Sequence, residues 1–177
     1  MFYKILLSLL CFLGLSNAAV DIKKLETFKA QFTQIIESSS GKTIEYKGDV
    51  FIKNTGKILW KYKTPIEKNV YILNNFAIID EPELEQAIYT QLQNEINIIK
   101  LLQSAKEIEK NKYLTNIDNT DYIIEVSKET SKISKISYKD KLENSVEINF
   151  ENSIENNEIN DSVFKFSAPD YYDIIRK

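Results

Sequence analysis

The sequence predicts a mainly β (α+β) protein, in which one domain is built on an antiparallel meander of roughly nine to eleven strands. Three observations support this class. Apolar and polar residues alternate with a period of two through most of the chain. Short segments rich in Asn, Asp, Ser and Lys separate these runs and are typical of turns. Only one long stretch has the spacing of a helix.

Residues 1–18 have the features of a secretory signal peptide, which leaves residues 19–177 as a single domain. Lys4 supplies a positive charge, residues 5–15 form an apolar run, and residues 16–18 end in small side chains suited to cleavage after Ala18. The apolar run is about eleven residues long, which is short of the roughly 20 that span a bilayer. We therefore expect export from the cytoplasm with cleavage of the signal.

Two alternatives concern this N-terminus: an uncleaved membrane anchor, and lipidation at Cys11, which Leu10 in front of it disfavours. Cleavage would remove Cys11, the only Cys, and would leave a chain without Cys or His. That composition excludes disulfides, the usual zinc sites and catalytic Ser–His or Cys–His pairs. Positive and negative charges are interspersed, which gives nucleic-acid binding no support. We expect no metal and no cofactor.

The first half of the chain contains the clearest strands. Apolar stripes of one parity run through residues 28–36, 44–52 and 58–62, with less regular runs at 70–73 and 76–79. Each stripe leaves a polar opposite face, as in an antiparallel sheet with one buried side. Ile35 and Leu59 have the opposite parity, so we expect them to face outward.

The second half repeats the pattern and adds the helix. Further strands are expected around residues 122–126, 136–138, 146–150 and 164–166. Residues 94–110 predict an amphipathic helix instead, because their apolar residues recur at helical spacing. These residues are Ile98, Leu101, Leu102, Ala105 and Ile108. A second, short helix is expected over residues 20–26.

A sheet of about ten strands has a wide apolar face, which these helices cover only in part. Either the sheet surrounds a filled core, as a barrel or sandwich, or it stays curved with a helical cover over a cavity. Composition leaves both possibilities open.

Five sequence blocks resemble those of the periplasmic outer-membrane lipoprotein carrier protein family (LolA). The blocks occur in the same order as in that family, at similar spacing and behind a signal peptide. They are residues 28–34 (F-x-A-x-F-T-Q), 48–53 (G-x-h-h-h-K, with h apolar), 60–65 (W-x-h-x-x-P), 82–87 (P-x-x-E-Q-A) and 164–169 (F-x-F-x-x-P).

The resemblance implies an open, strongly curved antiparallel β-barrel of about 10–11 strands, with a helical lid over an apolar cavity. It implies a monomeric carrier that receives acylated lipoproteins from an inner-membrane ABC transporter and delivers them to an outer-membrane acceptor of unknown type. The alternatives are a β-module of the same fold that acts as a sensor or receptor for lipid or protein ligands, and an enzyme. An enzyme is not expected, because the carboxylates alternate with Lys on the wet faces of the strands.

The candidate acyl-binding residues are apolar residues of the first stripes and of the expected helix. On the concave face they are Phe28, Phe32, Val50, Ile52, Ile58, Trp60 and Tyr62, and on the lid they are Ile98, Leu101, Leu102 and Ala105. The alternative for each is simple core packing. The family usually has an Arg that latches the lid directly after the second block, but this chain has Asn54 there. No catalytic residue is expected.

Overall fold

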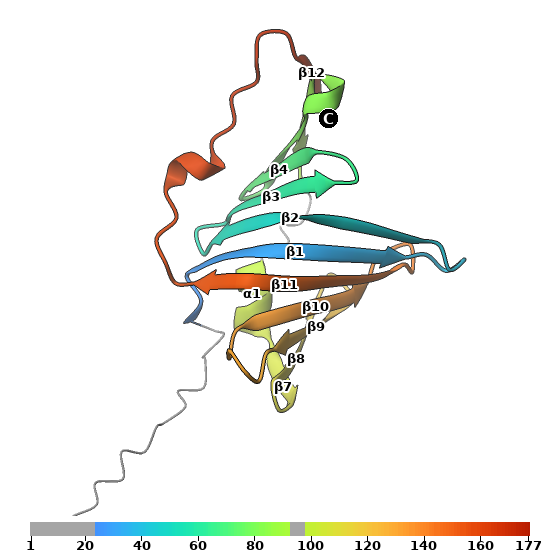
Figure 1. Ribbon diagram of the computed structural model, residues 1–177, viewed down its shortest axis with the longest axis vertical. Helices are drawn as coiled ribbons and strands as arrows, with labels where there is room; N and C mark the ends of the chain where they lie inside the picture. The colour runs from blue at the N-terminus through green and yellow to red at the C-terminus, as the bar shows by residue number, and fades with distance from the viewer. Residues whose placement is uncertain (1–23, 93–97) are drawn as a thin grey trace, which may run out of the picture.

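The computed structural model describes residues 24–92 and 98–177, and within these ranges twelve strands form one sheet (Figure 1). The predicted signal peptide and residues 20–23 of the expected helix over residues 20–26 lie outside them. Of the three remaining residues, Lys24 has 3-10 conformation, whereas Leu25 and Glu26 are not helical. The strands are β1 (Thr27–Glu37), β2 (Thr43–Lys53), β3 (Lys57–Thr64), β4 (Lys68–Leu73), β5 (Phe76–Glu81), β6 (Gln86–Gln91), β7 (Lys106–Glu109), β8 (Lys112–Ile117), β9 (Thr120–Val126), β10 (Ile133–Lys139), β11 (Ser145–Glu155) and β12 (Asp173–Arg176). The helical elements are α1 (Ile98–Ser104) and the 3-10 turns η2 (Pro82–Leu84) and η3 (Asp161–Phe164).

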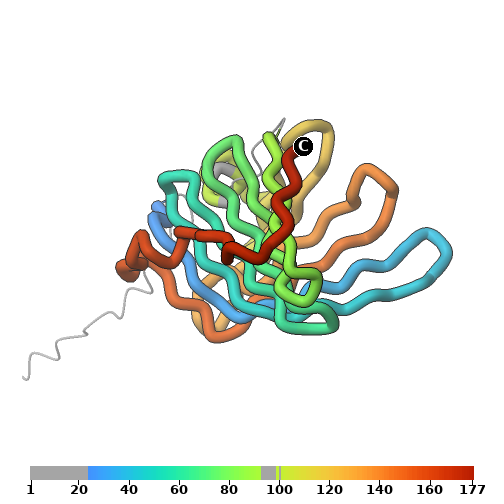
Figure 2. Tube along the Cα trace, turned by 90° about the horizontal axis from the view of Figure 1, so that it is seen from above, coloured from blue at the N-terminus to red at the C-terminus, as the bar shows by residue number. Residues whose placement is uncertain are grey.

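The strand order is β12-β6-β5-β4-β3-β2-β1-β11-β10-β9-β8-β7, so β12 and β7 are the edges. Each strand pairs antiparallel with its neighbours, except that β12 pairs parallel with β6. β1 joins the two halves because it pairs with β2 on one side and β11 on the other. The sheet is strongly curved, as Figure 2 shows from above. The mainly β class and the open, curved sheet are therefore confirmed.

The concave face of the sheet carries the larger core. Residues of even number in β1, β2 and β3 point to this face, where Phe28, Val50 and Ile58 are almost completely buried. The equivalent residues of β9, β10 and β11 complete it, and the rings of Phe28 and Phe150 meet edge to face at 5.2 Å. Helix α1 packs against this face through buried residues, namely Ile99, Leu101 and Leu102.

The convex face carries a second core, which corrects the expectation that Leu59 faces outward. Leu59 is only 2% exposed, since it packs with Tyr71 and Ile78 under Ile159 and Phe164. The last two belong to residues 156–172, which we call the C-terminal strap; it runs from β11 to β12 (Figure 1). The expected strand at residues 164–166 is wrong, because Phe164 ends η3 and residues 165–166 are irregular.

The expected helix over residues 94–110 is too long. Helix α1 ends at Ser104, and Lys106–Glu109 form the edge strand β7, which pairs with β8. Ile108 therefore lies on a strand, with 49% of its surface exposed. The expected count of about 10–11 strands is also lower than the twelve strands of the sheet, because β6, β7, β8 and β12 have no clear apolar stripe. Among the described residues, no helix has both the length and the apolar character needed to cross a bilayer.

Candidate functional site

The concave face is not filled completely: a cavity of about 170 Å³ remains between the sheet and α1. Trp60, Tyr62 and Leu101 line it, and all three belong to the predicted set. The other lining residues are Gln34, Ile72, Tyr122, Ile136, Tyr138 and Ile148. The walls are therefore mainly apolar and aromatic, and their few polar groups are the amide of Gln34 and the hydroxyl groups of the Tyr side chains.

Most of the other predicted residues support the cavity without lining it. Val50, Ile52, Ile58 and Leu102 are 0–1% exposed and belong to the packed core. Phe28 and Ala105 are as deeply buried, at 1%. Phe32 lies directly behind the cavity, because its ring contacts the rings of Trp60 and Tyr62 edge to face at 4.9 and 5.2 Å. Ile98 begins α1, but its side chain lies outside the described part of the chain.

Six lining residues were not predicted as site residues. Tyr122, Ile136, Tyr138 and Ile148 lie on apolar stripes of the second half, but those stripes alone do not reveal which strand of the first half they face. The pairing of β1 with β11 supplies that information. Gln34 could have been found, because it is the one polar residue in the even-numbered stripe of β1 between Phe28 and Ile36.

The polar tips of the cavity are uncharged. The Tyr62 hydroxyl donates a hydrogen bond to Gln34 Oε1 at 3.2 Å. Burial raises the pKa of Tyr62 and that of Tyr138 to about 12, so both phenols stay protonated near neutral pH. The Lys68 ammonium nitrogen lies 4.7 Å from the centre of the Tyr62 ring, in a cation–π contact.

Asn54 lies exposed in the turn after β2, where its backbone N–H donates to the Glu26 carbonyl oxygen at 2.7 Å. The hydroxyl groups of Ser104 and Thr115, 2.7 Å apart, share a hydrogen bond that joins the end of α1 to β8. Thr115 is buried, so this contact fixes the C-terminal end of the helix on the concave face.

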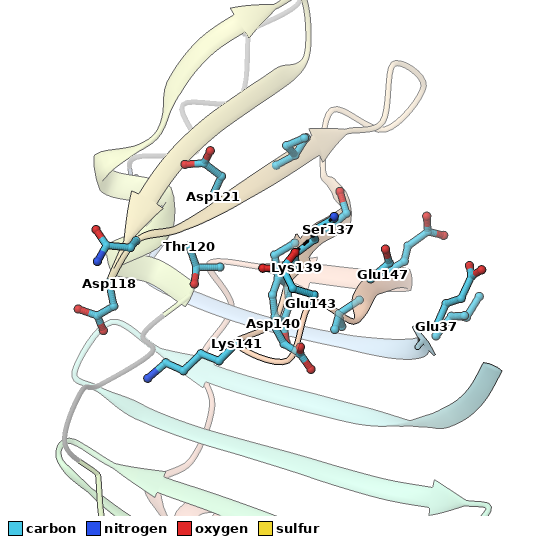
Figure 3. A pocket seen from close by; sticks show the side chains of 16 residues that line it. Glu37, Asp118, Thr120, Asp121, Ser137, Lys139, Asp140, Lys141, Glu143 and Glu147 are labelled. Atoms are coloured by element: carbon cyan, nitrogen blue, oxygen red, sulfur yellow. Dashed lines mark ion pairs between the residues drawn. The ribbon is translucent and has the colours of Figure 1, made fainter. Parts of the chain in front are cut away.

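A larger hollow of about 780 Å³ lies over the turns β8–β9 and β10–β11. Figure 3 shows its labelled carboxylates spread around the hollow, with Asp118 and Glu147 on different sides. Asp140 caps its own turn by accepting hydrogen bonds from the backbone of Leu142 and from Asn144. Among the described residues, no group of three His, Cys, Asp or Glu could hold a metal ion.

The fold and the cavity define a class of small binding protein in which a curved sheet presents an apolar concave face. More specifically, the chain belongs to the outer membrane lipoprotein carrier protein family LolA, whose family model matches residues 23–167. This is a family of carrier proteins and not of enzymes.

Relatives and a solved structure agree with this assignment. An outer-membrane lipoprotein carrier protein of Campylobacter jejuni is 40% identical over 158 residues, which cover 89% of this chain and 90% of that protein. Another, from Wolinella succinogenes, is 35% identical and covers 90% and 92%. The crystal structure of an uncharacterized conserved protein from Thermus thermophilus has the same fold, with a TM-score of 0.54, 8% identity and coverage of 90% and 95%.

Proposed function

We propose that this protein is a periplasmic carrier that buries the acyl chains of lipoproteins on its concave face and takes them from the inner to the outer membrane. Membership of the carrier family is the observation that carries the proposal. The apolar cavity under α1 supplies a place for the cargo. Residues 1–18 would direct export, and residues 19–177 would work as one monomeric domain.

The free energy of exposed acyl chains explains why a carrier is needed. Each methylene exposed to water costs about 0.8 kcal/mol, and a lipoprotein has dozens of methylenes. Free diffusion across an aqueous compartment is therefore prohibitively slow. A protein with an apolar concave face offsets most of this cost while staying in water itself.

The cavity is too small for this cargo as it stands. Its volume of about 170 Å³ lies below the roughly 300–1,000 Å³ of most ligand sites, and a cavity of about 150 Å³ holds a benzene-sized group. Helix α1 would therefore act as the lid: it swings away, and acyl chains take the place of Leu101 and its neighbours. Ser104 and Thr115 would hold the hinge end, in place of a latch at Asn54.

Such an exchange keeps binding reversible. Binding buries the acyl chains but exposes the underside of α1. The net binding free energy is therefore the difference between the free energy gained by burying the chains and the similar free energy lost by exposing the helix. A carrier needs this balance, because it must release its cargo to an outer-membrane acceptor as readily as it takes it from an inner-membrane ABC transporter.

The test is release of a newly made lipoprotein from spheroplasts upon addition of purified protein. Trp60→Glu puts a charge into the cavity wall and should abolish release. Leu142→Glu is the matched control, since Leu142 is 79% exposed in the β10–β11 turn and should leave release unchanged. Both variants should keep the wild-type circular dichroism spectrum.

Two results would contradict the proposal. Undiminished lipoprotein release by a folded Trp60→Glu variant would show that release does not depend on the cavity. Acyl binding without release by the wild-type protein would favour a sensor or receptor of the same fold.

A further inference from the structure

Exposed apolar side chains gather at one end of the sheet, where β3 and β5 end and β4, β6 and β12 begin. Ile66 of the β3–β4 turn, Leu84 of η2 and Tyr171 of the C-terminal strap are each more than half exposed. Figures 1 and 2 both show the two turns side by side. The Asp173 N–H donates a hydrogen bond to the Glu85 carbonyl oxygen, which holds the end of the strap against η2. One exposed apolar residue needs no explanation, but three at one end of a sheet indicate a contact surface.

Exposed carboxylates accompany these three side chains. They belong to the β3–β4 turn, the β5–β6 turn and the junction of the strap with β12, and they are Glu67, Glu83, Glu85, Asp170 and Asp173. Within the described ranges, none of these five takes part in an ion pair. The two lysines that flank the β3–β4 turn are engaged elsewhere, since Lys63 pairs with Asp49 and Lys68 lies over the Tyr62 ring. We call the five carboxylates and the three apolar residues the acidic patch.

A buried carboxylate lies next to the acidic patch. Asp80, near the end of β5, is only 7% exposed. Its Oδ2 accepts a hydrogen bond from Asn69 Nδ2 at 2.9 Å, but its Oδ1 has no hydrogen-bond partner in the part of the chain that the structure describes. Burial raises the pKa of Tyr172 and the charge of Asp80 raises it further, so Asp80 faces the strap beside Tyr171. A buried carboxylate oxygen without a donor costs free energy, which an incoming cation would recover.

We propose that the acidic patch is a docking surface for a partner protein that presents Lys or Arg side chains around an apolar centre. One cationic side chain of the partner reaches Asp80 Oδ1 beside Tyr172, and the others meet the exposed carboxylates. The apolar centre of the partner covers Leu84 and the other two apolar residues. This inference goes beyond the proposed function, because no residue of the acidic patch lines the cavity.

The charge of the acidic patch favours a basic protein over two other occupants. A membrane surface rich in anionic lipid attracts basic segments, so it would repel a patch whose charged residues are all acidic. A second copy of the chain would also be repelled, because a two-fold dimer places the same patch of both subunits face to face. A basic protein surface alone gains from both the charges and the apolar centre.

The test measures binding of three synthetic peptides to the isotope-labelled protein by NMR. The first peptide alternates Lys and Leu, the second alternates Glu and Leu, and the third alternates Lys and Ser. We expect the Lys–Leu peptide to shift the amide signals of residues 66–67, 83–85 and 170–173, and to bind more weakly as salt is added. The Glu–Leu peptide should not bind, and the Lys–Ser peptide should bind at least about 10-fold more weakly than the Lys–Leu peptide.

Variants of the chain test the position of the docking surface. Glu83→Lys combined with Glu85→Lys reverses two charges of the acidic patch and should weaken binding of the Lys–Leu peptide at least about 10-fold. Glu129→Lys combined with Glu158→Lys is the matched control, because it changes the net charge equally at two exposed sites outside the patch. Asp80→Asn keeps the shape of the buried side chain and should also weaken binding. Thermal melting of each variant checks that it is folded.

Several outcomes would overturn the inference. They are equal weakening by the two double variants, unchanged binding by folded Asp80→Asn, and signal shifts outside the acidic patch. Binding of the protein to vesicles of phosphatidylglycerol would favour a membrane surface instead. Dimerisation in analytical ultracentrifugation that Leu84→Ser abolishes would favour a second copy. None of these outcomes affects the proposed function, because lipoprotein release tests the concave cavity.

Discussion

Gly48 of β2 lies where two strands and an aromatic ring approach too closely for a side chain. A Cβ atom there would overlap the Lys61 carbonyl oxygen and lie 2.9 Å from Phe32 Cε1. Gly48→Ala must therefore shift the backbone of β3, which supports Trp60 and Tyr62. We expect the variant to lose about 3 kcal/mol of unfolding free energy or more, measured by urea denaturation.

Gly41→Ala is the control for that prediction. A Cβ at Gly41 meets nothing within 4 Å, so only its φ of +77° opposes a side chain, at a cost of about 1 kcal/mol. Similar losses in the two variants would show that backbone conformation, and not the close approach to β3, requires glycine at position 48.

At the scale of single residues, the sequence predicted which side chains share a face but not what covers each face. Alternation separates Ile58 from Leu59 correctly, and both are buried. Leu59 is covered by Ile159 and Phe164, about a hundred residues further along the chain, and no local pattern contains that contact. The lining of the cavity was predicted only in part for the same reason, since Tyr138 and Ile148 reach it through the pairing of β1 with β11.

Among the elements, the C-terminal strap is fastened to the convex face by ion pairs at Asp161. Its carboxylate contacts the ammonium groups of Lys53 and Lys57 at 2.6 and 2.7 Å. Hydrogen bonds from these two residues lower the pKa of Asp161 from 3.8 to about 2. Because the pKa is lower in the folded state, the stabilisation is present above about pH 4 and is lost as the pH falls toward 2.

Asp161→Asn should therefore melt at a lower temperature than the wild-type protein at pH 7. The difference should shrink between pH 4 and pH 2, where the wild-type carboxylate becomes protonated. Differential scanning calorimetry across this range checks the trend. Asp170→Asn is the control for loss of an exposed carboxylate from the strap, and an equal, pH-dependent effect there would contradict the specific role of Asp161.

The elements that the sequence misjudged are those whose conformation depends on a neighbour. Helical spacing holds through Ala105, but Lys106–Glu109 leave the helix because they pair with β8 at the edge of the sheet. All four residues of β7 are exposed, so no apolar stripe distinguishes the strand. Strands such as β1 and β2, with eleven residues each and a regular stripe, were predicted nearly to their ends.

For the molecule as a whole, the strand order and the curvature did not follow from periodicity. Nothing local indicates that β1 pairs with both β2 and β11, or that β12 returns to pair with β6. The open, curved form was implied by the resemblance of five blocks, and the strand order shows why the sheet is open, because its edges β12 and β7 do not pair with each other. Helix α1 packs against strands of both halves, namely β8 and β2.

The balance between closed lid and bound cargo makes a prediction about affinity. Leu102 belongs to α1 and is completely buried between the helix and the sheet, but it does not line the cavity. Leu102→Ala therefore weakens only the closed state, by about 2–5 kcal/mol. If α1 leaves the sheet when cargo binds, this variant should be less stable and yet bind an acyl probe at least about 10-fold more tightly.

Leu59→Ala is the matched control: it removes an equally buried Leu from the convex core, which stays packed in both states. Its stability should fall by a similar amount in urea denaturation, while its affinity in a fluorescence titration stays that of the wild-type protein. Weaker binding by Leu102→Ala would mean that the helix stays in place and contributes directly to the bound state.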